Sequence, residues 1–324
     1  MHPSEVLFQG TQAPVTIPAC DHYAGSEKLM RKSLALQQQR GPVFDITFDC
    51  EDGAAAGNEA AHAKLVASLI ANGEENRFSR IGARVHDVSS PFFEDDVAVI
   101  CAGAARQLAY LVIPKVEDVG QLSAAIDLVN HHAALAGRAA LPVHVLIETH
   151  QALHQAWDIA ALPAVECLSF GIMDFVSAHS GGIPAAAMQS PGQFTHPLVA
   201  RAKLEIAAAC HAHGKIASHN VTTEIRDLTV VADDALCAAQ KFGFSRMWSI
   251  HPDQITAILG AFAPATDEID DALAILSAAQ ATDWGPIQHK GKLHDRASYR
   301  YYWTVLQKAK RSGHVLPETA GGLL

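Results

Sequence analysis

The sequence lacks the features that mark membrane, secreted and disulfide-bonded proteins. No apolar run reaches the roughly 20 residues that a helix needs to cross a bilayer. The N-terminal string MHPSEVLFQG has no basic segment and no apolar core of a signal peptide. The six cysteines form no CxxC pair, so reduced thiols are expected rather than a disulfide framework or a zinc site. These absences predict a cytoplasmic protein.

Positive charge is also scarce. The 324 residues include 24 Lys and Arg against 34 Asp and Glu, which gives a net charge of −10. A general binding surface for nucleic acid or for an anionic membrane needs the opposite balance, so neither partner is expected. Hydrophobic residues make up 49% of the chain and charged residues 18%, as in a well-buried globular protein. A local pocket for an acidic small molecule is compatible with this composition.

Short apolar runs alternate with longer Ala-rich stretches of helical character. The runs predict eight strands, at residues 15–18, 43–48, 81–86, 110–114, 144–147, 165–170, 215–218 and 247–250. Helices are predicted between them, for example at residues 27–39, 59–72, 119–136, 197–213 and 233–242. The string EVLFQG resembles a viral-protease cleavage tag, so residues 1–10 are left out of this prediction.

Eight strands that alternate with helices predict a (β/α)8 TIM barrel, a fold of about 250 residues. A doubly wound open sheet is the alternative, but no GxGxxG motif follows the first predicted strand. We assign the barrel to residues 13–262 and a C-terminal helical extension, or lid, to residues 263–324. Within the extension the pattern predicts a helix at 267–281, a polar loop at 283–295 and an aromatic helix at 297–311.

Unusual polar residues gather where the predicted strands end. They are Phe48–Asp52, Arg84, Lys115, Ile147–Thr149, Gly171–Asp174, Ser218–Asn220 and Ile250–Pro252. The carboxyl ends of barrel strands converge on one face, where the active sites of such enzymes lie. The distribution therefore predicts a catalytic site at that face.

The residue types indicate metal chemistry. Glu148 and Asp174 follow adjacent predicted strands, and two carboxylates with water and substrate oxygens are a usual Mg²⁺ environment. Arg84 is suited to a substrate carboxylate, and the acidic residues of FDCED are suited to holding metal-bound waters. Structural roles are the alternatives: helix caps for the two carboxylates, and an ion pair with Asp49 or Glu51 for Arg84.

The 18 histidines invite a second metal hypothesis, which the spacing does not favour. His131 and His132 lie in a predicted helix and are interpreted as part of its solvated face. The HxH at residues 211–213 would place its side chains about 200° apart on a helix, a poor chelate. His219 and His251 lie at strand ends and are better placed for chemistry. Cys50 has no base paired with it by spacing and is interpreted as a buried thiol.

The chain resembles the citrate lyase beta-subunit-like (CoA ester lyase) branch of the HpcH/HpaI aldolase superfamily over about residues 15–312. The motifs that carry the resemblance are VTIPACD, FDITFDCEDGAAAGNEAAHAK, ARVHDVSSPFFEDDV, YLVIPKVED, VLIETHQALHQAWDIA, LSFGIMDF, HPLVARAKLEIAAACHAHG, SIHPDQI and GKLHDRASYRYYW. The resemblance implies a (β/α)8 barrel with a C-terminal helical segment, assembled as a homotrimer or hexamer.

The resemblance also implies roles for individual residues. Glu148 and Asp174 match the family's metal ligands for Mg²⁺, or Mn²⁺, and Arg84 matches the arginine that holds the substrate carboxylate. The remaining matches are Asp49, Glu51 and Asp52 to an acidic motif, Lys115 to a proline-lysine pair, and Asp295 to a lid aspartate that reaches a neighbouring subunit's site.

The implied reaction is a reversible aldol cleavage of a 3-hydroxy acyl compound, such as a malyl-CoA, citramalyl-CoA or citryl-CoA thioester. Arg84 would neutralise charge on the leaving fragment, and Asp295 or Glu51 is the candidate base, with Asp52 beside it. Many relatives carry a basic residue before the first strand, where this chain reads APVTIP, and an aspartate-glycine after the seventh, where it reads SHN. An aldolase acting on a free keto or hydroxy acid is therefore a second hypothesis, and a non-catalytic binding barrel is a third.

Overall fold

The structure is a computed structural model, and it describes residues 2–8 and 15–324. The chain divides into two compact units. The larger unit runs from Pro18 to Ala261, and the smaller contains residues 262–324 and the described residues before Pro18. The predicted barrel boundary at residue 13, like residues 9 and 10 of the tag-like string, lies outside the described residues.

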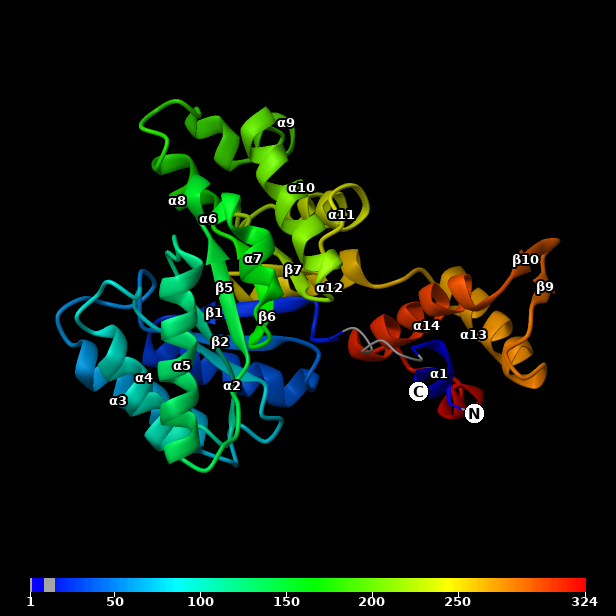
Figure 1. The fold of residues 1–324 in the computed structure, drawn as a ribbon, viewed down its shortest axis with the longest axis horizontal. Coiled ribbons are helices and arrows are strands. Elements are labelled where there is room, and N and C mark those ends of the chain that lie inside the picture. Colours follow the sequence, from blue (N-terminus) through cyan, green and yellow to red (C-terminus); the bar gives the residue numbers. More distant parts are fainter. Residues whose placement is uncertain (1, 9–14) are drawn as a thin grey trace. The chain divides into compact units, whose positions relative to one another are not determined.

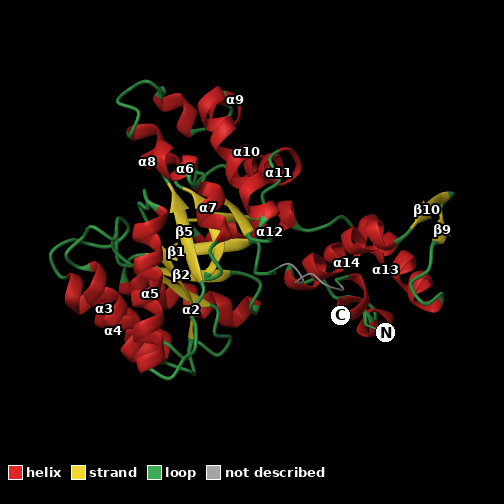
Figure 2. Cartoon of the chain, in the orientation of Figure 1, coloured by secondary structure: helices red, strands yellow, loops and turns green. Residues whose placement is uncertain are grey.

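The larger unit is a closed parallel barrel (Figures 1 and 2). Its strands are β1 Cys20–Ala24, β2 Asp45–Asp49, β3 Ile81–Arg84, β4 Leu108–Ile113, β5 Val143–Ile147, β6 Val165–Phe170, β7 Ile216–His219 and β8 Arg246–Ser249. Each strand pairs with the next, and β8 pairs with β1, where Met247 lies opposite Cys20. Closure confirms the predicted (β/α)8 barrel and excludes the open sheet.

Helices surround these strands, as the red ribbons around the yellow arrows of Figure 2 show. They are α2 Glu27–Arg40, α3 Glu59–Ala71, α4 Phe93–Ala104, α5 Val119–Leu135, α6 His150–His154, α7 Ala156–Ala161, α8 Ile172–Ser177, α9 Gly192–Thr195, α10 Pro197–Ala212, α11 Leu228–Lys241 and α12 Pro252–Phe262, with the 3₁₀ turn η1 Ala185–Met188. Helix α5 illustrates the local cause. Asp118 caps its N-terminus by accepting the N–H of Gln121 at 2.8 Å, and Leu122 and Val129 share its buried face.

The barrel interior around Arg246, the first residue of β8, is polar. Arg246 is fully buried and lies 3.0 Å from Asp21 Oδ2 and 2.6 Å from Asp45 Oδ2. It also donates to the hydroxyl of Tyr110 at 3.2 Å. These residues come from β8, β1, β2 and β4 and meet across the barrel, so their side chains fill its interior. Buried charges are tolerated there because each finds an opposite charge.

The first strand begins at Cys20, not in the predicted segment 15–18, which has no regular structure. Pro18 cannot donate a ladder hydrogen bond, which disfavours a central strand there. The true strand, CDHYA, was missed because Asp21 and His22 look like surface residues. Both are buried, since Asp21 pairs with Arg246 and His22 Nδ1 lies 3.0 Å from Ser249 Oγ. Similarly, α11 begins at Leu228 rather than 233, because Asp227 caps it.

The smaller unit is helical with one hairpin. It contains α1 Pro3–Leu7, α13 Thr266–Ala281, β9 Ile287–His289, β10 Lys292–His294, α14 Arg296–Arg311 and the 3₁₀ turn η2 Glu318–Gly322. Its apolar core includes Val6 and Leu7 of the tag-like string, packed in one cluster with residues of α13 and α14. The predicted polar loop 283–295 is partly wrong, because it forms the β9–β10 hairpin around Lys290 and Gly291. Both turn residues have positive φ, which Gly291 adopts without strain.

Over the described residues, no helix combines the length and the apolar character that a membrane crossing requires.

Candidate active site

The predicted site residues of the barrel lie at the carboxyl ends of β2 to β6. Asp49 and Arg84 are the last residues of β2 and β3. Lys115 follows β4 by two residues, Glu148 directly follows β5, and Asp174 lies in the first turn of α8, after β6. The fold thus brings five elements that are far apart in sequence to one end of the barrel.

Arg84 is held by an acidic loop. Its Nε donates to Asp49 Oδ1 at 2.7 Å and its Nη2 to Asp49 Oδ2 at 2.5 Å, while Nη1 lies 3.0 Å from Glu51 Oε2. Burial disfavours the guanidinium charge, but Asp49 and then Glu51 outweigh this and hold the pKa of Arg84 above its ordinary value. The ion pair weighed as an alternative role for Arg84 therefore exists.

The contacts of Arg84 leave part of its donor capacity unused. A guanidinium has five N–H groups, and the two hydrogen bonds to Asp49 engage two of them. The ring of Tyr23 lies 5.5 Å from the guanidinium carbon and stacks on Trp248 at 4.7 Å. Tyr23 and Trp248 were not predicted as site residues, because an aromatic residue inside a strand reads as core. Asp49 also accepts the backbone N–H groups of Glu51 and Gly53, so both of its oxygens are engaged.

Lys115 joins the acidic loop to the next carboxylate. Its ammonium donates to Glu51 Oε1 and to Asp52 Oδ2, the latter at 3.1 Å, and its backbone N–H donates to Glu148 Oε2 at 2.9 Å. Partial burial opposes the charge, but the two loop carboxylates hold the pKa of Lys115 above its ordinary value. Lys115 is therefore half-buried and ion-paired beside Glu148. Glu51 Oε2 accepts no hydrogen bond within the described chain, although Arg84 lies close to it.

Glu148 is buried with a second carboxylate beside it. Burial, followed by the charge of Asp174, raises the pKa of Glu148 to about 8. A Cβ at Gly171 would lie 2.4 Å from Cγ and 2.5 Å from Oε1 of Glu148, so glycine is needed after β6 for Glu148 to occupy this position. Neither carboxylate serves as a helix cap, since Thr149 caps α6 and Gly171 precedes α8.

This donor set fits a hard divalent cation. Two neighbouring carboxylates, one of them buried without a formal counter-charge in contact, are stabilised by a cation between them. Among the described residues, no group of three or more His, Cys, Asp and Glu side chains is arranged to hold a metal ion. A cation bound by Glu148 and Asp174 would therefore need water or substrate oxygens as its other ligands.

The remaining candidates have other contacts. Asp295 belongs to the smaller unit, where its Oδ1 accepts the N–H of Ala297 at 3.0 Å and caps α14. Cys50 is buried, and burial raises the pKa of its thiol well above the ordinary value, which opposes a nucleophilic role. His219 is fully buried against Lys203, and burial lowers its pKa. His251 is half-buried, 3.5 Å from Asp253.

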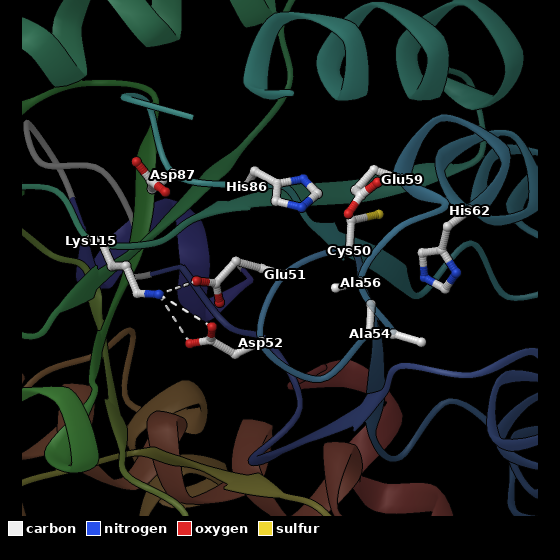
Figure 3. A pocket seen from close by; sticks show the side chains of 11 residues that line it. Cys50, Glu51, Asp52, Ala54, Ala56, Glu59, His62, His86, Asp87 and Lys115 are labelled. Atoms are coloured by element: carbon white, nitrogen blue, oxygen red, sulfur yellow. Dashed lines mark hydrogen bonds and ion pairs between the residues drawn. The ribbon is translucent and has the colours of Figure 1, made fainter. Parts of the chain in front are cut away.

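A cavity of about 400 Å³ adjoins the site (Figure 3). Its lining residues are Cys50, Glu51, Asp52, Ala54, Ala55, Ala56, Glu59, His62, His86, Asp87 and Lys115. Sequence reasoning singled out the acidic loop and Lys115 but missed His86. The available signal was its position, two residues after Arg84 at the end of the same strand.

Comparisons with known proteins identify the family and the fold. The family model described as HpcH/HpaI aldolase/citrate lyase matches residues 32–252. The L-malyl-CoA/beta-methylmalyl-CoA lyase of Cereibacter sphaeroides is 27% identical over 280 residues, which cover 82% of this chain and 87% of that protein. The crystal structure of a citrate lyase from Burkholderia xenovorans is 57% identical, with a TM-score of 0.86 over 100% of both chains. The protein CitE of Mycobacterium tuberculosis, solved with magnesium, acetoacetate and coenzyme A, is 21% identical with a TM-score of 0.68 over 91% of this chain and 99% of that one, a likeness of fold.

Proposed function

Because the chain belongs to the HpcH/HpaI aldolase/citrate lyase family, we propose that this carbon–carbon lyase is Mg²⁺-dependent and cleaves a 3-hydroxy acyl thioester. The thioester would be of the malyl-CoA, citramalyl-CoA or citryl-CoA type, and the products an acyl-CoA and a keto acid or glyoxylate. The names of the malyl-CoA lyases and of the citrate lyase that this chain resembles support the substrate class. The observation that carries the proposal is the pair Glu148 and Asp174, next to a buried arginine at the mouth of a barrel.

Glu148 and Asp174 would hold the cation. A bound Mg²⁺ supplies Lewis acidity toward the hydroxyl and carboxylate oxygens of the substrate. The backbone N–H of Lys115 keeps the buried carboxylate of Glu148 oriented, and Gly171 leaves room for it. Both features orient a metal ligand, a function that hydrogen bonds from outside the coordination sphere often perform.

Arg84 would stabilise the charge that develops on the leaving fragment. In the cleavage direction the substrate hydroxyl loses its proton, its C–O bond becomes a carbonyl, and the electrons of the broken C–C bond pass to the acyl fragment. The resulting enolate then takes a proton at carbon. The N–H groups of Arg84 that do not bond to Asp49 can donate to the enolate oxygen, while Asp49 holds the guanidinium in place. We therefore propose that Asp49 acts through Arg84 rather than by direct contact with the substrate.

A carboxylate must receive the hydroxyl proton. Glu51 Oε2 is buried and accepts no hydrogen bond from the described residues, so it is available for this role. Asp295 is the second candidate, and we propose that it enters the site of a neighbouring subunit in a homotrimer or hexamer. Asp52 and Lys115 hold Glu51 in position, since the ammonium of Lys115 bonds to both carboxylates. Size-exclusion chromatography with light scattering tests the assembly.

Isosteric variants test the metal site. Glu148→Gln and Asp174→Asn are expected to abolish Mg²⁺-dependent release of glyoxylate or pyruvate from the candidate thioesters, with little change in the circular dichroism spectrum. Glu94→Gln, an exposed carboxylate of α4, is the matched control and is expected to retain turnover. Full activity of either site variant, or full activity of the native protein in a chelator, would contradict the proposal.

A free keto or hydroxy acid is the alternative substrate, and one observation favours it. The residues directly before β1, Val15 to Ala19, include no basic side chain that could meet an anionic carrier. Calorimetric titration of the Mg²⁺-loaded protein with acetyl-CoA, pyruvate and glyoxylate separates the two. Tight binding of acetyl-CoA supports the thioester lyase, and binding of the keto acids alone supports the aldolase.

A further inference from the structure

The cavity beside the site contains a histidine whose orientation is fixed. His86 Nδ1 lies 2.7 Å from Asp96 Oδ2, and the same oxygen accepts the backbone N–H of His86 at 3.1 Å. The imidazole also packs against the ring of Phe92, with centroids 5.2 Å apart. Asp96 is 2% exposed, so this buried carboxylate holds the ring from behind.

The pairing leaves one ring nitrogen for a ligand. With Nδ1 directed at Asp96, Nε2 makes no hydrogen bond to another described residue. Figure 3 shows His86 among the side chains that line the cavity. A carboxylate behind an imidazole is a common way to fix which nitrogen faces a ligand.

The charge of the lining restricts what the cavity accepts. Its described lining carries the carboxylates of Glu51, Asp52, Glu59 and Asp87 against one ammonium, that of Lys115. A phosphate or a second carboxylate would meet net negative charge and lose its hydration. A neutral hydroxyl group is different, because it can donate a hydrogen bond to a carboxylate. It can also donate to, or accept from, an imidazole nitrogen.

The position of the cavity identifies which part of a substrate reaches it. Lys115 and Glu51 line the cavity, and both also belong to the site, since the backbone of Lys115 binds Glu148 and Glu51 lies beside Arg84. The keto-acid fragment is the one that Glu148 and Asp174 would hold through the cation. Its substituent is therefore the group adjacent to this wall.

We propose that the cavity receives the substituent of the keto-acid fragment, that this substituent is neutral and carries a hydroxyl group, and that His86 Nε2 forms a hydrogen bond with it. This inference rests on the proposed lyase reaction and narrows its keto-acid product to a hydroxylated 2-keto acid such as hydroxypyruvate, in place of glyoxylate, pyruvate or oxaloacetate. His86 is then a residue that determines specificity, and Asp96 is the residue that positions it.

Four 2-keto acids that differ only in the substituent test the proposal. They are pyruvate, 2-ketobutyrate, hydroxypyruvate and oxaloacetate, titrated calorimetrically into the Mg²⁺-loaded protein. Hydroxypyruvate is expected to bind about tenfold more tightly than 2-ketobutyrate, which has a methyl in place of the hydroxyl, since one net hydrogen bond is worth about a factor of ten. Oxaloacetate is expected to bind more weakly than both.

Two variants of His86 separate recognition from folding. In His86→Asn the amide can still donate to Asp96 from near the position of Nδ1, but nothing replaces Nε2, so the tenfold preference is expected to fall below about twofold. In His86→Gln the longer amide reaches toward the position of Nε2 and is expected to restore part of the preference. His131→Asn, an exposed histidine of α5, is the control and keeps the full preference.

The outcomes distinguish this inference from the proposed function. If pyruvate binds in a Mg²⁺-dependent way but hydroxypyruvate is not preferred, or if His86→Asn keeps the preference, the inference is overturned and the lyase proposal stands. If oxaloacetate is preferred, the assignment of a neutral substituent is overturned. If none of the four acids binds with Mg²⁺ present, the proposed function fails and the inference fails with it.

Discussion

Replacing Asp49 with asparagine tests how the acidic loop and Arg84 work together. The Asp49 carboxylate accepts from Arg84 and a backbone N–H at each oxygen: Nε and Glu51 N at Oδ1, and Nη2 and Gly53 N at Oδ2. In Asp49→Asn an NH₂ group replaces one of these oxygens. Whichever way the amide is oriented, the NH₂ faces one donor of Arg84 and one backbone donor.

The cost of this change follows from the two lost acceptors. A hydrogen bond to a charged group contributes about 1.5–3 kcal/mol and a neutral one about 0.5–1.5 kcal/mol. The free energy of unfolding is therefore expected to fall by about 2–4.5 kcal/mol. The guanidinium of Arg84 also loses half of the fork that orients it. Because a displacement of about 1 Å in a catalytic group can reduce turnover by about 100-fold, kcat/KM is expected to fall by roughly that factor.

A double-mutant cycle with Arg84→Lys decides whether Asp49 acts through Arg84. Lysine is a point charge and cannot reproduce two-point binding of a carboxylate, so Arg84→Lys alone is expected to lose at least as much activity as Asp49→Asn. If Asp49 only positions Arg84, the double variant is expected to be no less active than Arg84→Lys.

The assay is release of the keto acid from the best of the malyl-CoA, citramalyl-CoA and citryl-CoA substrates, with urea unfolding as the measure of stability. Asp127→Asn, an exposed residue of α5, controls for the loss of one negative charge. Additive losses in the double variant would show that Asp49 also touches the substrate and would refute the reasoning. Native-like stability of Asp49→Asn would refute the role of the four contacts.

Three further predictions concern other buried groups. Cys50→Ala is expected to keep turnover within about threefold, because burial holds the thiol protonated; a loss of 100-fold would contradict this. Arg246→Met leaves Asp21 and Asp45 buried without their shared cation and is expected to reduce the free energy of unfolding by about 3–5 kcal/mol in a urea titration; a loss below about 1 kcal/mol would contradict the pairing. Burial lowers the pKa of His22 to about 4 from its ordinary 6.5, so the unfolded chain takes up a proton that the folded chain excludes. This group is expected to remove about 3 kcal/mol of stability as the pH falls from 6.5 to 4, and His22→Asn should have a shallower stability profile over that range, whereas an unchanged slope would count against the assignment.

The parts of the fold that depend on local pattern could be predicted from the sequence. The apolar run of residues 165–170 coincides with β6, and the helix predicted at 27–39 differs from α2 by one residue. Barrel geometry also explains why candidates at strand ends, such as Arg84 and Glu148, were found together. Once strands alternate with helices, their carboxyl ends meet at one face regardless of sequence separation.

The features that were missed depend on partners far away in the chain. Asp21 reads as exposed until Arg246 is known to lie 3.0 Å away, and no local pattern encodes a contact between residues 21 and 246. The ion pair of Lys115 with Glu51 is similar, because 64 residues separate the two. His86 was missed for a different reason. A histidine at a strand end is ambiguous until Asp96, on the following helix, is seen to fix its ring.

Arg84 shows why competing interpretations of one residue need not exclude each other. The sequence left open whether this arginine binds a substrate or forms an ion pair with the acidic loop. The structure establishes the ion pair, with Asp49 engaging Nε and Nη2 of the guanidinium and Glu51 lying beside Nη1. A substrate-binding arginine in a buried site needs such support, because an unpaired charge there is costly and a flexible one is poorly oriented. The same contacts that make Arg84 structural therefore leave its remaining N–H groups oriented for an anionic ligand.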